Sequence, residues 1–205
     1  WFGNACGNEF SVPAWQVNAC HLGRYAKWTF LPDLGRGEGC MGLSPVTAPS
    51  ATSFEDAPCL EYQVYFPKTG TQTVCLGVLP TQDVMPERGL RLAFGLDGGI
   101  VRTLDARQGF VDTFSEYTPK NLKKSPKLKP LPPRNKTLKL INGDGFCRNE
   151  IFDNLRWLTA EFEVEKPGLH TFKVYMVDPE IVLEQLVFNP DNTHPSYFGA
   201  PSVRH

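Results

Sequence analysis

The sequence lacks long hydrophobic runs and helical periodicity. No uninterrupted apolar stretch in the 205 residues approaches the roughly 18 residues that are needed to cross a bilayer, so we predict no membrane segment. Nowhere do apolar residues recur with a period of 3.6 over four helical turns. Helix is therefore expected to be a minor element.

The common catalytic motifs are also missing. There is no Walker motif, no H-E-x-x-H and no G-x-S-x-G. The segment 37–42 matches G-x-G-x-x-G, but no buried strand precedes it and Pro45 prevents a long helix after it. Four acidic residues could supply a glycosidase pair, although one sequence does not show their separation: Asp97, Asp105, Asp178 and Glu180. We assign no catalytic residue, and an autonomous esterase or hydrolase stays the least favoured hypothesis.

Metal-binding patterns are sparse as well. No C-x-x-C occurs, and no His lies at zinc-ligand spacing from a pair of cysteines, so we predict no zinc site. The six cysteines permit three disulfides in an exported protein or a set of buried thiols, and spacing does not decide between these alternatives. We predict no cofactor; a structural calcium ion on Asp97, Asp105 or Asp178 is left open.

What the chain does contain is a pattern of short apolar strands separated by turns. Hydrophobic residues make up 41% of the chain, which also has 18 Gly and 18 Pro. Alternating apolar and polar residues over 60–66 and 158–164 predict half-buried strands. Each is followed by a turn and a partner strand, at 74–78 and 172–176. Further strands are expected around 9–14, 26–31, 39–46, 90–96, 100–104, 138–141 and 181–188.

About ten strands with so many turns favour an all-β fold. We predict a single domain over residues 1–205 that forms a two-sheet antiparallel β-sandwich, jelly-roll-like in form. The nearly continuous apolar run at 181–188 is typical of a central strand that is covered on both faces.

The segment 119–136 departs from this pattern. It contains seven basic residues, five prolines and no acidic residue. Proline at this density is incompatible with a helix or a ladder strand, so we expect an extended surface loop with polyproline character. Because no aromatic residues are interleaved to stack on bases or sugars, a solvated insertion is favoured over a cationic arm that binds an acidic glycan or a nucleic acid.

Aromatic residues are the main binding candidates. Sugar rings stack their C–H faces on flat side chains, and the four Trp residues, with Tyr197 near the end, could serve as platforms. The alternative is that each Trp belongs to the core. His170 shares the inward-facing side of its strand with Phe172, and we interpret it as a core histidine bonded to a backbone group.

Several short segments, spread over roughly residues 25 to 201, match a known protein family in their order and spacing. They are Trp28 with Leu34-Gly35-Arg36, Leu60-Glu61-Tyr62, Leu79-Pro80-Thr81, Gly89-Leu90-Arg91 running to Asp97, Asp153-Asn154, Gly168-Leu169-His170-Thr171, Met176-Val177-Asp178-Pro179 and Ser196-Tyr197-Phe198-Gly199-Ala200-Pro201. This series resembles the C-terminal β-sandwich domain of glycoside hydrolase family 115, the xylan α-glucuronidases. The resemblance implies a non-catalytic module, similar in form to carbohydrate-binding modules, whose catalytic partner lies in upstream domains.

The leading hypothesis is an accessory carbohydrate-binding domain of an exported polysaccharide-degrading protein, located outside the cell, in the periplasm or at the cell surface. Trp28, Trp157 and Tyr197 are expected to stack on sugars, and Arg36 to pair with a uronic carboxylate. The expected partners are a plant polysaccharide or acidic oligosaccharide such as glucuronoxylan, an upstream catalytic domain and a second copy of the chain. The alternative is a dimerisation or docking domain that packs beside a catalytic domain and binds no sugar.

Overall fold

The computed structural model describes residues 1–4, 8–81, 85, 88–107, 153–190, 202, 204 and 205. Within these ranges the chain forms strands and turns and no helix. The strands are β1 (Phe10–Pro13), β2 (Ala19–His21), β3 (Lys27–Pro32), β4 (Gly39–Ser44), β5 (Cys59–Phe66), β6 (Gly70–Val78), β7 (Arg91–Leu96), β8 (Arg102–Asp105), β9 (Arg156–Val164), β10 (Gly168–Met176) and β11 (Leu183–Phe188).

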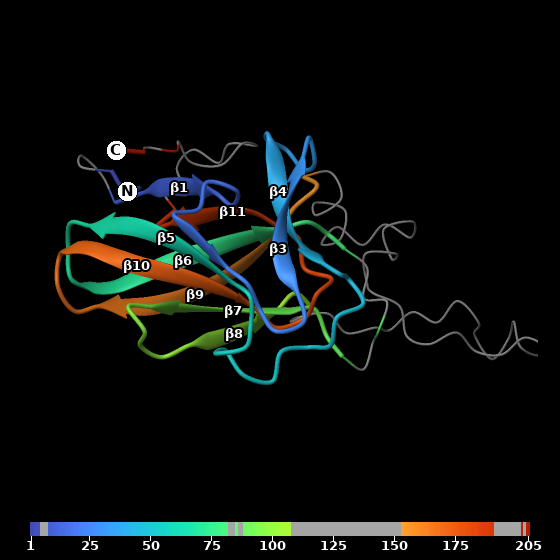
Figure 1. Ribbon diagram of the computed structural model, residues 1–205. Helices are drawn as coiled ribbons and strands as arrows, with labels where there is room; N and C mark the ends of the chain where they lie inside the picture. Colours follow the sequence, from blue (N-terminus) through green and yellow to red (C-terminus); the bar gives the residue numbers. More distant parts are fainter. Residues whose placement is uncertain (5–7, 82–84, 86–87, 108–152, 191–201, 203) are drawn as a thin grey trace, which may run out of the picture.

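The strands form two antiparallel sheets that pack face to face (Figure 1). One is a six-stranded sheet with the order β3-β4-β11-β6-β9, in which β1 also pairs with β11. The other is a five-stranded sheet with the order β2-β5-β10-β7-β8. The predicted fold class, a two-sheet antiparallel β-sandwich, is therefore confirmed.

The alternation of residue types places the two sheets on a common core. Burial alternates residue by residue along β5 and along much of β9, as the sequence pattern predicts for strands with one face inward. Rings from both sheets meet in the middle: Phe94 stacks on Phe172 with centroids 5.4 Å apart, and Phe172 meets Phe188 edge-on at 5.0 Å. Such pairs add to the free energy gained by burying the rings.

Three β-hairpins close at one end of the sandwich. Figure 1 shows the β5–β6, β7–β8 and β9–β10 turns gathered there, and we call this the hairpin end. Asp97 and Gly98 adopt positive φ angles of 50° and 74°, and Gly168 one of 138°. These left-handed conformations reverse the chain in a few residues, which Asp and Gly tolerate best.

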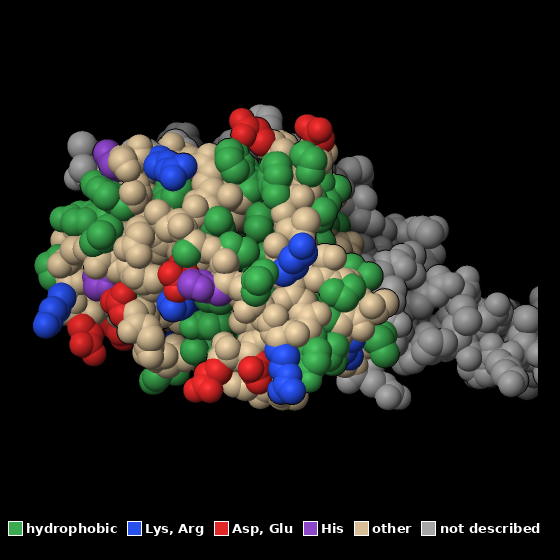
Figure 2. All heavy atoms as spheres, viewed as in Figure 1, with side chains coloured by type: hydrophobic (Ala, Val, Ile, Leu, Met, Phe, Trp, Pro, Cys, Tyr) green, Lys and Arg blue, Asp and Glu red, His purple; other side chains and the backbone are tan. Residues whose placement is uncertain are grey.

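The two ends of the chain lie together beside β5. The Trp1 amino group donates to the His205 carbonyl at 3.0 Å, and the two rings stack with centroids 4.2 Å apart. Phe2 forms bridges with both Val64 and Arg204. Figure 2, in the same view, shows basic and acidic side chains interspersed among hydrophobic ones over this face.

The structure can be compared with the predictions for individual strands and for the cysteines. The run at 181–188 contains β11, which lies inside the six-stranded sheet and is buried along its whole length, as predicted. Strand β2 was not predicted, because three residues without alternation give no periodic signal. The predicted strand at 138–141 and the loop at 119–136 lie outside the described residues. Among the described cysteines, Cys20, Cys40, Cys59 and Cys75 are free thiols.

No helix in the described part of the chain is long and apolar enough to pass through a membrane.

His170 lies on the inward-facing side of β10, and its Nε2 is hydrogen bonded to the Lys166 carbonyl at 2.8 Å. The predicted backbone bond of this histidine is thus confirmed.

Candidate functional site

Trp28 is a core residue in the structure. It lies on β3 with 4% of its surface exposed, and its indole Nε1 donates to the Pro58 carbonyl at 3.1 Å. Both faces of the ring are therefore covered by protein, which corrects the prediction that Trp28 stacks on a sugar. Lys27 and Thr29 flank it on the other side of the strand, so strand alternation directs the indole inward.

Arg36 and Trp157, two of the predicted binding residues, are brought together. The guanidinium carbon of Arg36, in the β3–β4 turn, lies 5.5 Å from the centroid of the Trp157 ring on β9. A guanidinium at this distance interacts favourably with the electron-rich face of an indole. Trp157 points away from the core and keeps 39% of its surface exposed.

A glycine makes room for the Trp157 ring. Gly77 on β6 is the register partner of Trp157, and a Cβ at that position would lie 2.9 Å from the ring atom Cζ3. Any larger side chain would displace the indole. The ring therefore packs against the backbone of Gly77 and beside the guanidinium of Arg36, and 39% of the Trp157 surface stays exposed.

Arg36 is itself held by the protein. Its backbone N–H and its Nε donate to Glu184 Oε1 at 2.7 and 3.4 Å, and one terminal nitrogen donates to Gln185 Oε1 at 3.3 Å. The side chain is 4% exposed. These contacts occupy the guanidinium, so they oppose the predicted bidentate pairing of Arg36 with a uronic carboxylate. The structure instead gives Arg36 the role of a brace for Trp157.

The turn that carries Arg36 is tightly packed. Gly35 has a φ of 90°, and a Cβ there would lie 2.7 Å from the Cys40 sulfur. Burial, together with the nearby negative charge of Glu184, raises the pKa of the Cys40 thiol to about 12. The thiol is thus neutral and donates to the Leu34 carbonyl at 3.1 Å, which fixes the turn over the sheet.

Tyr197, the fourth predicted binding residue, lies outside the described residues. Of the other Trp residues, Trp15 packs beside Phe30 with centroids 5.7 Å apart, and Trp1 lies 5.1 Å from Tyr65. Neither ring contacts the Arg36–Trp157 pair through a described contact. The site that the sequence predicted with four residues is represented in the structure by two.

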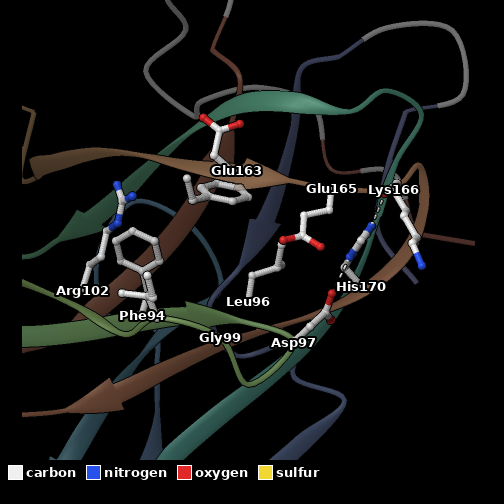
Figure 3. Close-up of a pocket in the computed structure, with 11 residues that line it drawn as sticks. Phe94, Leu96, Asp97, Gly99, Arg102, Glu163, Glu165, Lys166 and His170 are labelled. Carbon is white, nitrogen blue, oxygen red and sulfur yellow. Dashed lines mark hydrogen bonds and ion pairs between the residues drawn. The ribbon is translucent and has the colours of Figure 1, made fainter.

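A pocket of about 500 Å³ opens at the hairpin end (Figure 3). It lies between two edge strands, β8 of the five-stranded sheet and β9 of the six-stranded sheet, and the turns that follow β7 and β9. Its apolar lining comes from Phe94, Leu96, Ile100 and Phe162, and its polar lining from Asp97, Arg102, Glu163, Glu165, Lys166 and His170. No sequence pattern predicts that these residues form a pocket, although the turn at Asp97 and the inward position of His170 were predicted.

Hydrogen bonds fix the walls of the pocket. Asp97 accepts from the Thr171 backbone N–H at 2.8 Å and is hydrogen bonded to His170 Nδ1 at 2.6 Å, which ties the β7–β8 turn to β10. On the opposite side Arg102 donates to the backbone carbonyl of Glu161, so it links β8 to β9. The pocket therefore has a defined shape rather than being a gap between loops.

The carboxylates that could have formed a glycosidase pair or a calcium site are engaged separately. Asp178 is fully buried and accepts from Arg91 Nε at 2.8 Å and from Ser50 Oγ at 2.6 Å. Asp105 accepts from Arg107, while Glu180 pairs with Arg88. No group of three His, Cys, Asp or Glu side chains suited to a metal ion occurs within the described ranges.

Comparison with known proteins identifies the family. The family model of the glycosyl hydrolase family 115 C-terminal domain matches residues 11–117 and 145–202. No curated protein sequence matches the chain.

Several solved structures are similar to this chain at low sequence identity. One is the C-terminal CBM6 of the marine laminarinase LamC from Zobellia galactanivorans, at 13% identity and a TM-score of 0.49, covering 89% of this chain and 99% of that one. A family 35 carbohydrate-binding module from Clostridium thermocellum matches at 12% identity and 0.49, covering 87% and 97%. A family GH115 4-O-methyl-α-glucuronidase with specificity for decorated arabinogalactans matches at 13% and 0.49, over 86% of this chain and 18% of the enzyme.

The family match extends over most of the chain and agrees with the two-sheet fold described above. The chain belongs to the glycosyl hydrolase family 115 C-terminal domain family and is a non-catalytic, carbohydrate-associated accessory module.

Proposed function

We propose that this module binds plant polysaccharide through Trp157, and that it does so as the accessory part of an exported enzyme whose catalytic domain lies upstream. The observation that carries the proposal is the setting of Trp157. A large indole points outward from a rigid sheet, is braced by Arg36 and retains an open part. A preorganised aromatic side chain loses little entropy when a sugar stacks on it.

The proposed ligand is a xylan or arabinogalactan chain, including its glucuronic acid decorations. Because the guanidinium of Arg36 is bonded to Glu184 and Gln185, we assign contact with sugar to the indole. Arg36 contributes by holding the ring in position. This division of roles predicts that loss of Arg36 weakens binding without removing the surface on which a sugar stacks.

The test is affinity electrophoresis of the purified module in gels with glucuronoxylan, unsubstituted xylan or arabinogalactan. We expect retardation by at least one of these, lost in Trp157→Ala and partly kept in Trp157→Phe, which preserves an aromatic face. Leu22→Ala is the matched control, because Leu22 is a large exposed apolar residue away from the pair. Failure of all three polysaccharides to retard the wild-type module would contradict the proposal, as would unchanged retardation of Trp157→Ala.

A docking or dimerisation module is the second candidate. Leu22 and Tyr25 are large apolar side chains that lie exposed in the β2–β3 connection, where a catalytic domain or a second copy could cover them. Sedimentation analysis separates the two functions. A stable dimer that Tyr25→Ala dissociates, with no retention by any polysaccharide, would favour docking.

A further inference from the structure

We propose that the pocket at the hairpin end is a second ligand site and that it takes a neutral pyranose sugar. The proposal shares its ligand class with the proposed function but not its residues, since no residue of the Arg36–Trp157 pair lines the pocket. The volume of about 500 Å³ lies within the ~300 to 1,000 Å³ that is typical of small-molecule sites.

The apolar lining suits the C–H face of a sugar ring. Phe94 and Phe162 come from opposite sheets, and their ring centroids lie 6.2 Å apart in an edge-on arrangement. Both rings are nearly buried, with 1% and 6% of their surfaces exposed, so the apolar surface open to a ligand comes mainly from Leu96 and Ile100. Figure 3 shows Phe94 and Leu96 in the pocket wall. Ile100, at the mouth, is 85% exposed. An apolar side chain so open to water gains contact area when a ring covers it.

The polar lining supplies acceptors for sugar hydroxyls. Figure 3 shows the Glu165 carboxylate pointing toward the middle of the pocket, while Lys166 points away from it. Asp97 is fixed by His170 and Thr171. Glu163 points to the other side of β9, where its Oε1 accepts from Thr71 Oγ1 at 2.6 Å, so its carboxylate does not face the pocket. Carboxylates such as those of Asp97 and Glu165 accept hydrogen bonds from hydroxyl groups and form stronger bonds than neutral acceptors do.

The charge of the lining distinguishes among sugars. Two carboxylates, those of Asp97 and Glu165, face the pocket, while Glu163 points away from it. Of the two cationic side chains in the lining, Arg102 donates to the Glu161 carbonyl and Lys166 points outward. A uronic acid would bring a third carboxylate close to these two, and like charges repel most strongly where water is partly excluded. The pocket therefore favours an uncharged ring over glucuronic acid.

The experiment is a ¹H–¹⁵N NMR titration of the ¹⁵N-labelled module with xylobiose, galactose and glucuronic acid in separate series. We expect the neutral sugars to shift the amide signals of Gly98, Gly99 and His170, and glucuronic acid to shift them less at equal concentration. Glu165→Ala should weaken the binding of the neutral sugars by about tenfold or more, the usual effect of losing one hydrogen bond to a charged group. Glu55→Ala is the matched control, because Glu55 is also exposed and lies in the β4–β5 connection, away from the pocket.

Trp157→Ala separates this proposal from the proposed function. A pocket that holds a single sugar makes few contacts and is not expected to retain a polysaccharide by itself. If the pocket is an independent site, Trp157→Ala therefore abolishes retention by polysaccharide gels and leaves the shifts at Gly98 and Gly99 unchanged. Three results would overturn the pocket proposal while leaving Trp157 unaffected: no shift at these amides with either neutral sugar, the same shifts with glucuronic acid, or full shifts in Glu165→Ala.

Discussion

The hydroxyl of Tyr62 donates a hydrogen bond to the backbone carbonyl of Ala14 at 2.7 Å. Tyr62 lies on β5 of the five-stranded sheet, and Ala14 follows β1 of the six-stranded sheet, so this bond joins the two layers. The ring is fully buried, and burial raises the pKa of its hydroxyl well above the ordinary value of 10. The group therefore stays protonated and continues to donate at any pH at which the module is folded.

Tyr62→Phe removes this donor and leaves the Ala14 carbonyl without it. An unsatisfied buried acceptor costs about 1 to 3 kcal/mol, which corresponds to a decrease in Tm of roughly 2 to 4 °C per kcal/mol for a domain of this size. Thermal unfolding followed by circular dichroism measures the change. The control is Tyr175→Phe, because Tyr175 is only partly buried on the outer face of the same sheet. Equal Tm values for Tyr62→Phe and the wild type would show that the bond contributes nothing.

Glu61 should stabilise the fold in a pH-dependent way. Its carboxylate on β5 lies 2.5 Å from the Lys173 ammonium on β10 and 3.1 Å from His21 on β2, and these bonds hold the Glu61 pKa below the ordinary value of 4.5. A lowered folded-state pKa stabilises the fold above the unfolded pKa, and this contribution is lost as the pH falls through the folded pKa. The pKa of Lys173 is raised above 10.5, mainly by its bond to Glu61, so its contribution is lost only above that pH.

We therefore expect Glu61→Gln to lower the free energy of unfolding by about 1 kcal/mol at pH 7 and by progressively less below pH 4.5. Urea unfolding between pH 3 and pH 7 measures the difference, with Glu55→Gln as the control for removing an exposed charge. A constant difference between Glu61→Gln and the wild type over this range would contradict the ion-pair explanation.

The free thiols should differ sharply in reactivity. Burial raises the pKa of both Cys40 and Cys59 to about 12 and also raises the pKa values of Cys75 and Cys20, but Cys20 is exposed while the other three are buried. The thiolate is the reactive form and must be accessible to the reagent, so at pH 8 iodoacetamide should slowly modify Cys20 in the folded module. Cys40, Cys59 and Cys75 should react only after unfolding. Mass spectrometry of the resulting peptides assigns each site, and rapid native labelling of Cys40 would show that the β3–β4 turn opens.

Much of the fold follows from local patterns that the sequence displays. The β9–β10 hairpin was predicted because Leu158, Phe162 and Val164 alternate with charged or polar residues before a Gly turn. The short strand β2 was not, since its pairing with β5 depends on tertiary contacts rather than on its own residues. The order of the strands in the sheets could not be predicted either. Alternation shows which side chains of a strand face the core, but it does not show which strands pair with each other.

The candidate sites depended on distant contacts and were harder to predict. Arg36 and Trp157 were named separately, but their stacking results from a turn that crosses the sheet, and no spacing in the sequence encodes it. Strand alternation assigns Trp28 and Trp157 each to one face of its strand, but the packing of the sheets determines whether that face is covered. The pocket residues come from two hairpins whose closeness follows from the sandwich alone.

The bond from Arg102 to the Glu161 carbonyl has a consequence for solubility. The edge strands β8 and β9 carry backbone groups that a foreign strand could pair with, and exposed edges of this kind template aggregation. Arg102 occupies one of these β9 carbonyls and places a positive charge beside the edge. The same side chain that links the two sheets thus also discourages copies of the module from adding to one another strand by strand.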